Sequence, residues 1–113
     1  MANGFPDDFV ATIWQGVIRI VNKLVETHDN HGFGKFKEGM NPRLEMVVSA
    51  FTVADEMLKA LIGSAELNPD EYRDALNARQ CIYHTKQMSL ALEANDEAEY
   101  HRLIELLQKQ APV

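Results

Sequence analysis

Residues 41–63 read NPRLEMVVSAFTVADEMLKALIG, and this stretch decides the fold. Asn41 is a favoured helix N-cap, Pro42 suits a first helical turn, and Gly63 suits a C-terminal cap. Apolar residues recur at helical spacing on one face: Leu44, Val47, Val48, Phe51, Ala54, Leu58 and Leu61. A second apolar face runs beside the first: Met46, Ala50, Val53, Met57 and Ala60. The stretch therefore predicts a helix over 42–62 that is apolar on more than one side.

The preceding segment predicts another long helix, over residues 6–29. Pro6 suits its first turn, and the acidic Asp7 and Asp8 suit the positive end of the helix dipole. Its apolar residues again have helical spacing: Phe9, Val10, Ile13, Trp14, Val17, Ile18, Ile20, Val21, Leu24 and Val25. This stripe is too wide for an ordinary surface helix, so we expect the helix to be central in the domain or part of a dimer interface.

Two more helices are predicted downstream, over 69–94 and 96–109. Residues 68–71 (NPDE) repeat the helix-start signal of residues 41 and 42, and Asp96 and Glu99 have capping-box spacing. The expected core face of the helix over 69–94 comprises nine residues: Tyr72, Ala75, Leu76, Arg79, Ile82, Tyr83, Met88, Leu90 and Leu92.

The order of these elements predicts an all-α fold, a four-helix bundle-like single domain over 1–113. Three of its helices are long and the C-terminal one is short. Short connections after the second and third helices favour antiparallel neighbours, as in a helical bundle.

Composition narrows the class of protein. The 113 residues include 11 basic and 17 acidic side chains, for a net charge of −6, which argues against a surface built throughout for nucleic acid. The single cysteine, Cys81, excludes an intramolecular disulfide and is typical of a reducing, cytoplasmic setting. We see no apolar run of the roughly 20 residues that a membrane span needs. We expect no membrane contact and no cofactor.

Residues 30–41 contain three glycines and predict a loop rather than a helix. Four of its residues are candidate partner contacts: Phe33, Lys35, Phe36 and Lys37. Alternatively, the two phenylalanines pack back over the core while the lysines stay in water. With Arg43, the lysines form the basic cluster of the chain, so nucleic-acid binding is expected at most locally, within the 31–43 loop.

His28 and His31 lie three residues apart with Asp29 between them. Residues at this spacing share a helix face, and two imidazoles with a carboxylate could hold a transition metal or a small ligand. Alternatively, histidines at the end of a helix are favoured there by the helix dipole without any metal.

Arg79 and His84 form an Arg-x4-His pattern on the predicted helix over 69–94. The pattern resembles the signature of HEPN-type ribonucleases, which are small helical bundles. The resemblance implies that Arg79 and His84 would converge across a dimer to activate a ribose 2′-hydroxyl and stabilise the phosphate. It covers these two residues of the chain, and the alternative is an arginine and a histidine on a polar helix face.

Acidic residues concentrate in the second half of the chain. Residues 64–113 carry five basic and nine acidic side chains, net −4. Four acids lie close together: Glu93, Asp96, Glu97 and Glu99. They sit at a helix start, where capping explains part of the pattern. The rest could present a negative surface to a basic partner, which is similar to how small acidic helical proteins of immunity-protein or phage-inhibitor type work.

The wide apolar stripes predict a dimer or partner face that includes five residues: Ile18, Ile20, Met46, Val53 and Met57. The favoured function is a non-enzymatic, acidic, helical protein-interaction module, an inhibitor or regulator that binds a basic macromolecule and forms a homodimer. The alternatives are a HEPN-like ribonuclease and a metal or small-ligand protein that uses His28 and His31.

Overall fold

The computed structural model describes residues 9–64 and 66–110. They form α1 (Phe9–Ser64), α2 (Pro69–Glu93) and α3 (Glu97–Gln110). The described residues contain no strand. The predicted all-α, bundle-like fold is confirmed.

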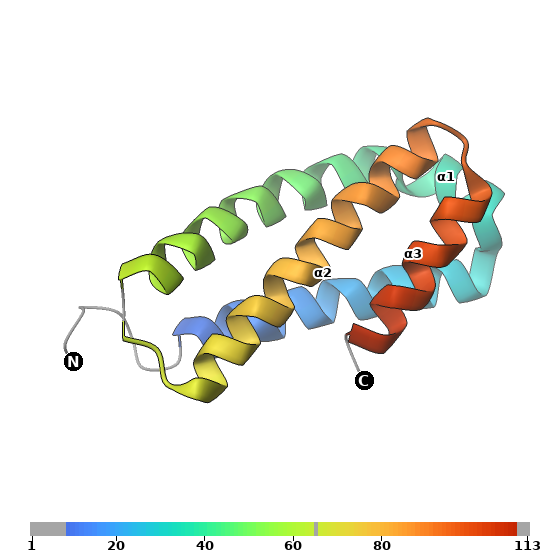
Figure 1. Ribbon diagram of the computed structural model, residues 1–113. Coiled ribbons are helices and arrows are strands. Elements are labelled where there is room, and N and C mark those ends of the chain that lie inside the picture. The colour runs from blue at the N-terminus through green and yellow to red at the C-terminus, as the bar shows by residue number, and fades with distance from the viewer. Residues whose placement is uncertain (1–8, 65, 111–113) are drawn as a thin grey trace.

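α1 consists of two arms that meet at Gly32. The backbone of Gly32 is non-helical, with φ 73° and ψ −177°. We call residues 9–31 the N-arm and residues 33–64 the C-arm. Figure 1 shows the arms folded back along each other, with α2 running across them and α3 returning beside α2. Residues 9–64 and 66–110 thus form four helical segments in an elongated body of 48 × 23 × 18 Å.

The predicted loop over residues 30–41 is wrong, because the described backbone is helical there except at Gly32. The backbone is helical on both sides of Gly32, so the C-arm begins well before the predicted start at residue 42. Each glycine inside a helix costs only about 1 kcal/mol relative to alanine. Packing of Phe33 against the core favours the helical course of this segment. The side chains of Lys35, Phe36 and Lys37 lie outside the described part of the structure, as do residues 6–8 of the first predicted helix.

The connections around α2 follow local capping chemistry. Asn68 and Glu71 form a capping box: the Glu71 N–H donates to Asn68 Oδ1 at 2.8 Å, and the Asn68 N–H donates to Glu71 Oε1 at 3.0 Å. At the other end, Asn95 has a φ of 58°. The N–H of Asp96 bonds to the carbonyl of Ala91 at 2.8 Å, which closes a Schellman motif. This turn sends α3 back along α2.

The core lies between the two arms, α2 and α3. Leucines supply much of it, and Tyr100 of α3 is its largest fully buried side chain. The predicted core face of α2 is wrong for four residues, which are exposed: Tyr72, Leu76, Tyr83 and Leu90. Small residues take their place against the core: Ala75, Ala78, Cys81 and Thr85. Together with Ile82, Met88 and Leu92 they form the buried face of α2, where the small side chains let the helix approach its neighbours closely.

Candidate functional site

The C-arm carries an exposed apolar stripe. Met46, Val53 and Met57 are 74%, 61% and 40% exposed, and Ala50 between them is also exposed. These residues follow one another at spacings of four, three and four, which places them in one line along the helix. Such spacing is typical of a seam between two helices. We call these four residues the C-arm stripe.

α2 carries a second exposed stripe with the same periodicity. Tyr72, Leu76, Tyr83 and Leu90 are the exposed large apolar residues of this helix. Arg79 and Lys86 lie at intermediate positions of the same line. We call the four apolar residues the α2 stripe. The stripe lies on the side of α2 opposite its buried small residues.

A groove separates the C-arm from α2. It has a volume of about 560 Å³ and is lined by side chains from both helices: Glu45, Val48, Ser49, Thr52, Lys86, Ser89, Leu90 and Glu93. Its walls include the apolar Val48 and Leu90. The two helices run antiparallel here, so Glu45 and Glu93 share the end of the groove near the turn between α2 and α3.

An ion pair ties the two walls together further along. The Nε of Arg79 donates to Oδ1 of Asp55 at 2.9 Å, joining α2 to the C-arm. This contact directs the Arg79 side chain toward the C-arm. The ion pair therefore helps to hold together the two helices that form the groove.

His84 lies on a different side of α2 from Arg79. Its Nδ1 is 2.7 Å from Oε1 of Gln110 in α3, and the Nε2 of Gln110 donates to Oε1 of Gln80 at 3.1 Å. Within one chain, therefore, the structure does not bring Arg79 and His84 to a shared site. The convergence across a dimer that the HEPN resemblance implies stays a prediction.

His28 belongs to an aromatic cluster where α1 turns. Its Nδ1 is 2.7 Å from the hydroxyl of the buried Tyr100. The ring of Phe33 lies 5.1 Å from that of Tyr100, and the ring of His101 lies 5.4 Å from that of His28. Burial, assisted by repulsion from His101, lowers the pKa of His28 below 6.5, while Asp29 opposes the shift. His28 thus has a structural role, because it contacts a buried residue of the core.

The predicted metal site is not supported by a ligand cluster in the described residues. His31 is exposed, and His28 faces Tyr100. Among the described residues, no group of three or more His, Cys, Asp or Glu side chains is placed to hold a metal ion. The geometry of His28 is explained by its contacts with α3.

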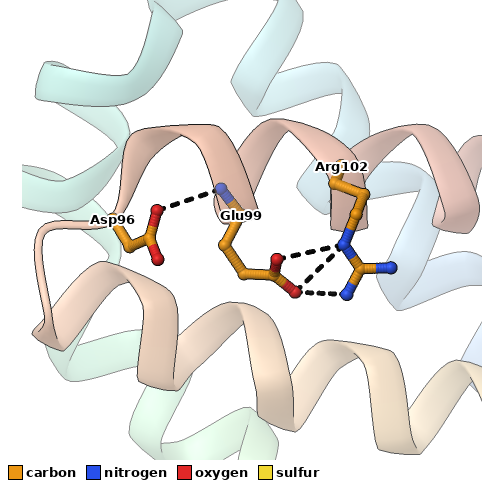
Figure 2. A network of polar contacts seen from close by, with 3 residues as sticks. All are labelled: Asp96, Glu99 and Arg102. Atoms are coloured by element: carbon orange, nitrogen blue, oxygen red, sulfur yellow. Dashed lines mark hydrogen bonds and ion pairs between the residues drawn. The ribbon is translucent and has the colours of Figure 1, made fainter.

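The acidic residues near the turn into α3 are partly used within the chain. Figure 2 shows Asp96 capping α3, with its Oδ1 3.1 Å from the Glu99 backbone nitrogen. Glu99 also faces the guanidinium of Arg102, whose Nε lies 3.0 Å from Oε2, and this contact lowers the pKa of Glu99. Glu97 lies 3.4 Å from Nε2 of His101. Glu93 differs from these three residues because it lines the groove.

Cys81 has the environment of a structural thiol. It is fully buried, and burial raises its pKa to about 11. A thiol with this pKa stays protonated near neutral pH, so it is a poor nucleophile. The residue contributes to the small-residue face of α2.

In the structure, the predicted dimer or partner face consists of exposed residues and of half-buried residues that pack against the core. Met46, Val53 and Met57 are exposed, whereas Ile18 and Ile20 are half-buried and pack against the core. The sequence reasoning missed the α2 stripe. The spacing of four, seven and seven residues along the α2 stripe could have indicated a single exposed line on the helix. The sequence analysis instead assigned these large apolar side chains to the core because of their size.

Comparisons with known proteins give no match: no family model, no curated protein and no solved structure matches this chain. Across the described residues, none of the helices combines the length and the apolar character needed to cross a membrane.

Proposed function

We propose that this chain is a non-enzymatic protein-interaction module that forms a homodimer and binds a basic macromolecule, as an inhibitor or a regulator does. One observation carries the proposal: two apolar stripes are exposed on neighbouring helices, with a groove between those helices. Monomeric soluble proteins rarely expose large contiguous apolar patches, and those that do commonly use them for binding. Both stripes also have the periodicity of helix–helix contacts.

The C-arm stripe is suited to pairing with a second copy of itself. Its side chains are large at the ends and smaller at the centre, in the order Met46, Ala50, Val53, Met57. A two-fold axis between Ala50 and Val53 would place Met46 against Met57 of the second copy and Ala50 against its Val53. Isologous interfaces have this reciprocal form. The small Ala50 allows a close approach, and the flexible methionines can fill the remaining space.

The contacts of the candidate catalytic residues support a non-enzymatic role. Arg79 pairs with Asp55, His84 contacts Gln110, and Cys81 is a buried thiol with a raised pKa. These side chains have structural roles that require no substrate. The acidic net charge of −6 favours a basic partner, because opposite charge speeds association and favours the correct orientation.

Sedimentation equilibrium of the wild-type chain and two matched variants tests the proposal. Val53→Glu and Leu90→Glu place the same charge on stripe residues of similar exposure, 61% and 55%. We expect wild type and Leu90→Glu to be dimeric at about 10 µM, a concentration that detects dissociation constants in the micromolar range. We expect Val53→Glu to be monomeric, because a charge would be buried in the C-arm seam.

A monomeric wild-type chain at about 100 µM would contradict the homodimer, since its dissociation constant would then be weaker than that range. Loss of the dimer in Leu90→Glu but not in Val53→Glu would also contradict the use of the C-arm stripe. Circular dichroism of both variants checks that the helices remain folded.

A further inference from the structure

The groove between the C-arm and α2 has the walls of a helix-binding site. Both walls are helices, whose backbone N–H and C=O groups are already paired within each helix. An extended peptide gains affinity by adding main-chain hydrogen bonds to a sheet edge, and these walls provide none. These walls therefore favour an occupant that satisfies its own backbone groups, as an amphipathic helix does when it places its apolar face in a groove.

The apolar and polar linings specify the contact face of such a helix. Val48 and Leu90 provide apolar surface from opposite walls, and Ser49, Thr52 and Ser89 add small side chains with hydroxyl groups. Leu90 is 55% exposed, so covering it would remove apolar surface from water. Leucine-sized residues at helical spacing fit this lining.

The charged side chains of the groove define where its occupant should carry basic and acidic residues. Glu45 and Glu93 lie at the end near the turn into α3, where Asp96 and Glu97 are also exposed. Lys86 lines the groove seven residues before Glu93, which is about 10 Å along the helix axis. The groove is thus acidic at one end and basic about two turns away.

We infer that the groove binds an amphipathic helix of a partner protein that carries Lys or Arg over Glu45 and Glu93 and an acidic residue about two turns away, over Lys86. This inference rests on the proposed function and names the site and the chemistry of the basic partner. Charge complementarity selects the partner and its direction in the groove, and the contacts with Val48 and Leu90 supply apolar burial.

Two designed peptides of identical composition test the inference. Both form amphipathic helices with leucines on one face. The matched peptide has a lysine pair at one end and a glutamate pair two turns away. In the swapped peptide one lysine and one glutamate are exchanged between the two ends, so each end carries one of each and reversal of the helix in the groove does not restore the match. Fluorescence anisotropy of each labelled peptide, titrated with the wild-type chain, measures its dissociation constant.

We expect the matched peptide to bind about tenfold more tightly than the swapped one at about 0.05 M salt, where the screening length exceeds 10 Å. The difference should shrink at about 0.5 M salt, where surface charges are strongly screened. Replacing Glu45 and Glu93 by glutamine should reduce the preference to the contribution of Lys86. The control double variant, Glu66→Gln with Glu105→Gln, makes the same net charge change at residues that do not line the groove and should retain the full preference.

Equal binding of the two peptides, with both weakened by Leu90→Ser, would overturn the charge assignment and leave a docking groove as the proposed function requires. Absence of saturable binding of either peptide at about 1 mM would overturn the groove as a helix site. Tighter binding of a single-stranded RNA oligomer than of the matched peptide would overturn the choice of partner class. The sedimentation result for the C-arm stripe is independent of all three outcomes.

Discussion

His28 and Tyr100 illustrate how a residue that resembles a metal ligand serves the core. The imidazole of His28 contacts the hydroxyl of Tyr100 at 2.7 Å, and the tyrosine ring is completely buried. The sequence placed His28 near His31 but contained no local indication that a residue 72 positions away would contact it. Only the return of α3 along the body brings Tyr100 and His101 to the end of the N-arm.

The lowered pKa of His28 predicts that the protein is less stable in mild acid. The unfolded chain has the ordinary histidine pKa of 6.5, while the folded chain holds the pKa of His28 below that value. As pH falls through 6.5, the unfolded state therefore binds more protons than the folded state, and the free energy of unfolding decreases. The stabilising effect is complete above pH 6.5 and is lost as pH falls through the folded-state pKa.

Urea unfolding between about pH 7.5 and pH 5, a range that brackets the ordinary histidine pKa, measures this effect. We expect His28→Gln to have a weaker dependence of stability on pH than wild type. Asn30→Gln, which changes an exposed residue without a titratable group two positions away, should retain the wild-type dependence. An identical pH dependence in His28→Gln and wild type would show that the His28 environment does not differ between the folded and unfolded states.

At the scale of elements, the direction of α1 depends on one residue. The sequence predicted a loop over 30–41 because the segment contains three glycines. The structure uses the conformational freedom of Gly32, whose φ of 73° with ψ near 180° lies in a region open essentially to glycine. Gly34, two residues later, lies in helical backbone. The break in α1 was therefore predictable from composition, but its restriction to one position was not.

Alanine substitutions at these two glycines should have opposite effects. Gly32→Ala should destabilise the fold by about 1–3 kcal/mol, because a Cβ is strained at this φ and ψ. Gly34→Ala should stabilise it by about 0.5–1 kcal/mol, because alanine favours the helix and its Cβ would meet no atom within 4 Å. Thermal and urea unfolding measure both effects. Similar stability changes of the same sign in the two variants would contradict the assignment of the break to Gly32.

At the scale of the whole molecule, α2 shows how position in the fold selects the buried face. The helix has the arms of α1 and α3 as neighbours (Figure 1). Its small residues face inward and its tyrosines face outward. The apolar pattern of the sequence assigned Tyr72, Leu76, Tyr83 and Leu90 to the core as well, because it has no information about the space between helices.

Two leucines of α2 should differ sharply in their effect on stability. Leu92 is completely buried, so Leu92→Ala should cost about 2–5 kcal/mol through lost burial and a residual cavity. Leu90 is 55% exposed, so Leu90→Ala should change stability by no more than about 0.5 kcal/mol. Urea unfolding at a protein concentration low enough to exclude association measures both values. Comparable losses would place Leu90 in the core and would contradict an open groove.

The sequence by itself determined the helical class and most of the helix ends. Helical periodicity, the helix start at residues 68–71 and the cap of α3 by Asp96 depend on residues within a few positions of one another, so local chemistry is sufficient to predict them. Only the tertiary structure decided which apolar face of each helix is buried. That choice depends on the shapes and distances of neighbouring helices, and it is what left the C-arm stripe, the α2 stripe and the groove open to a partner.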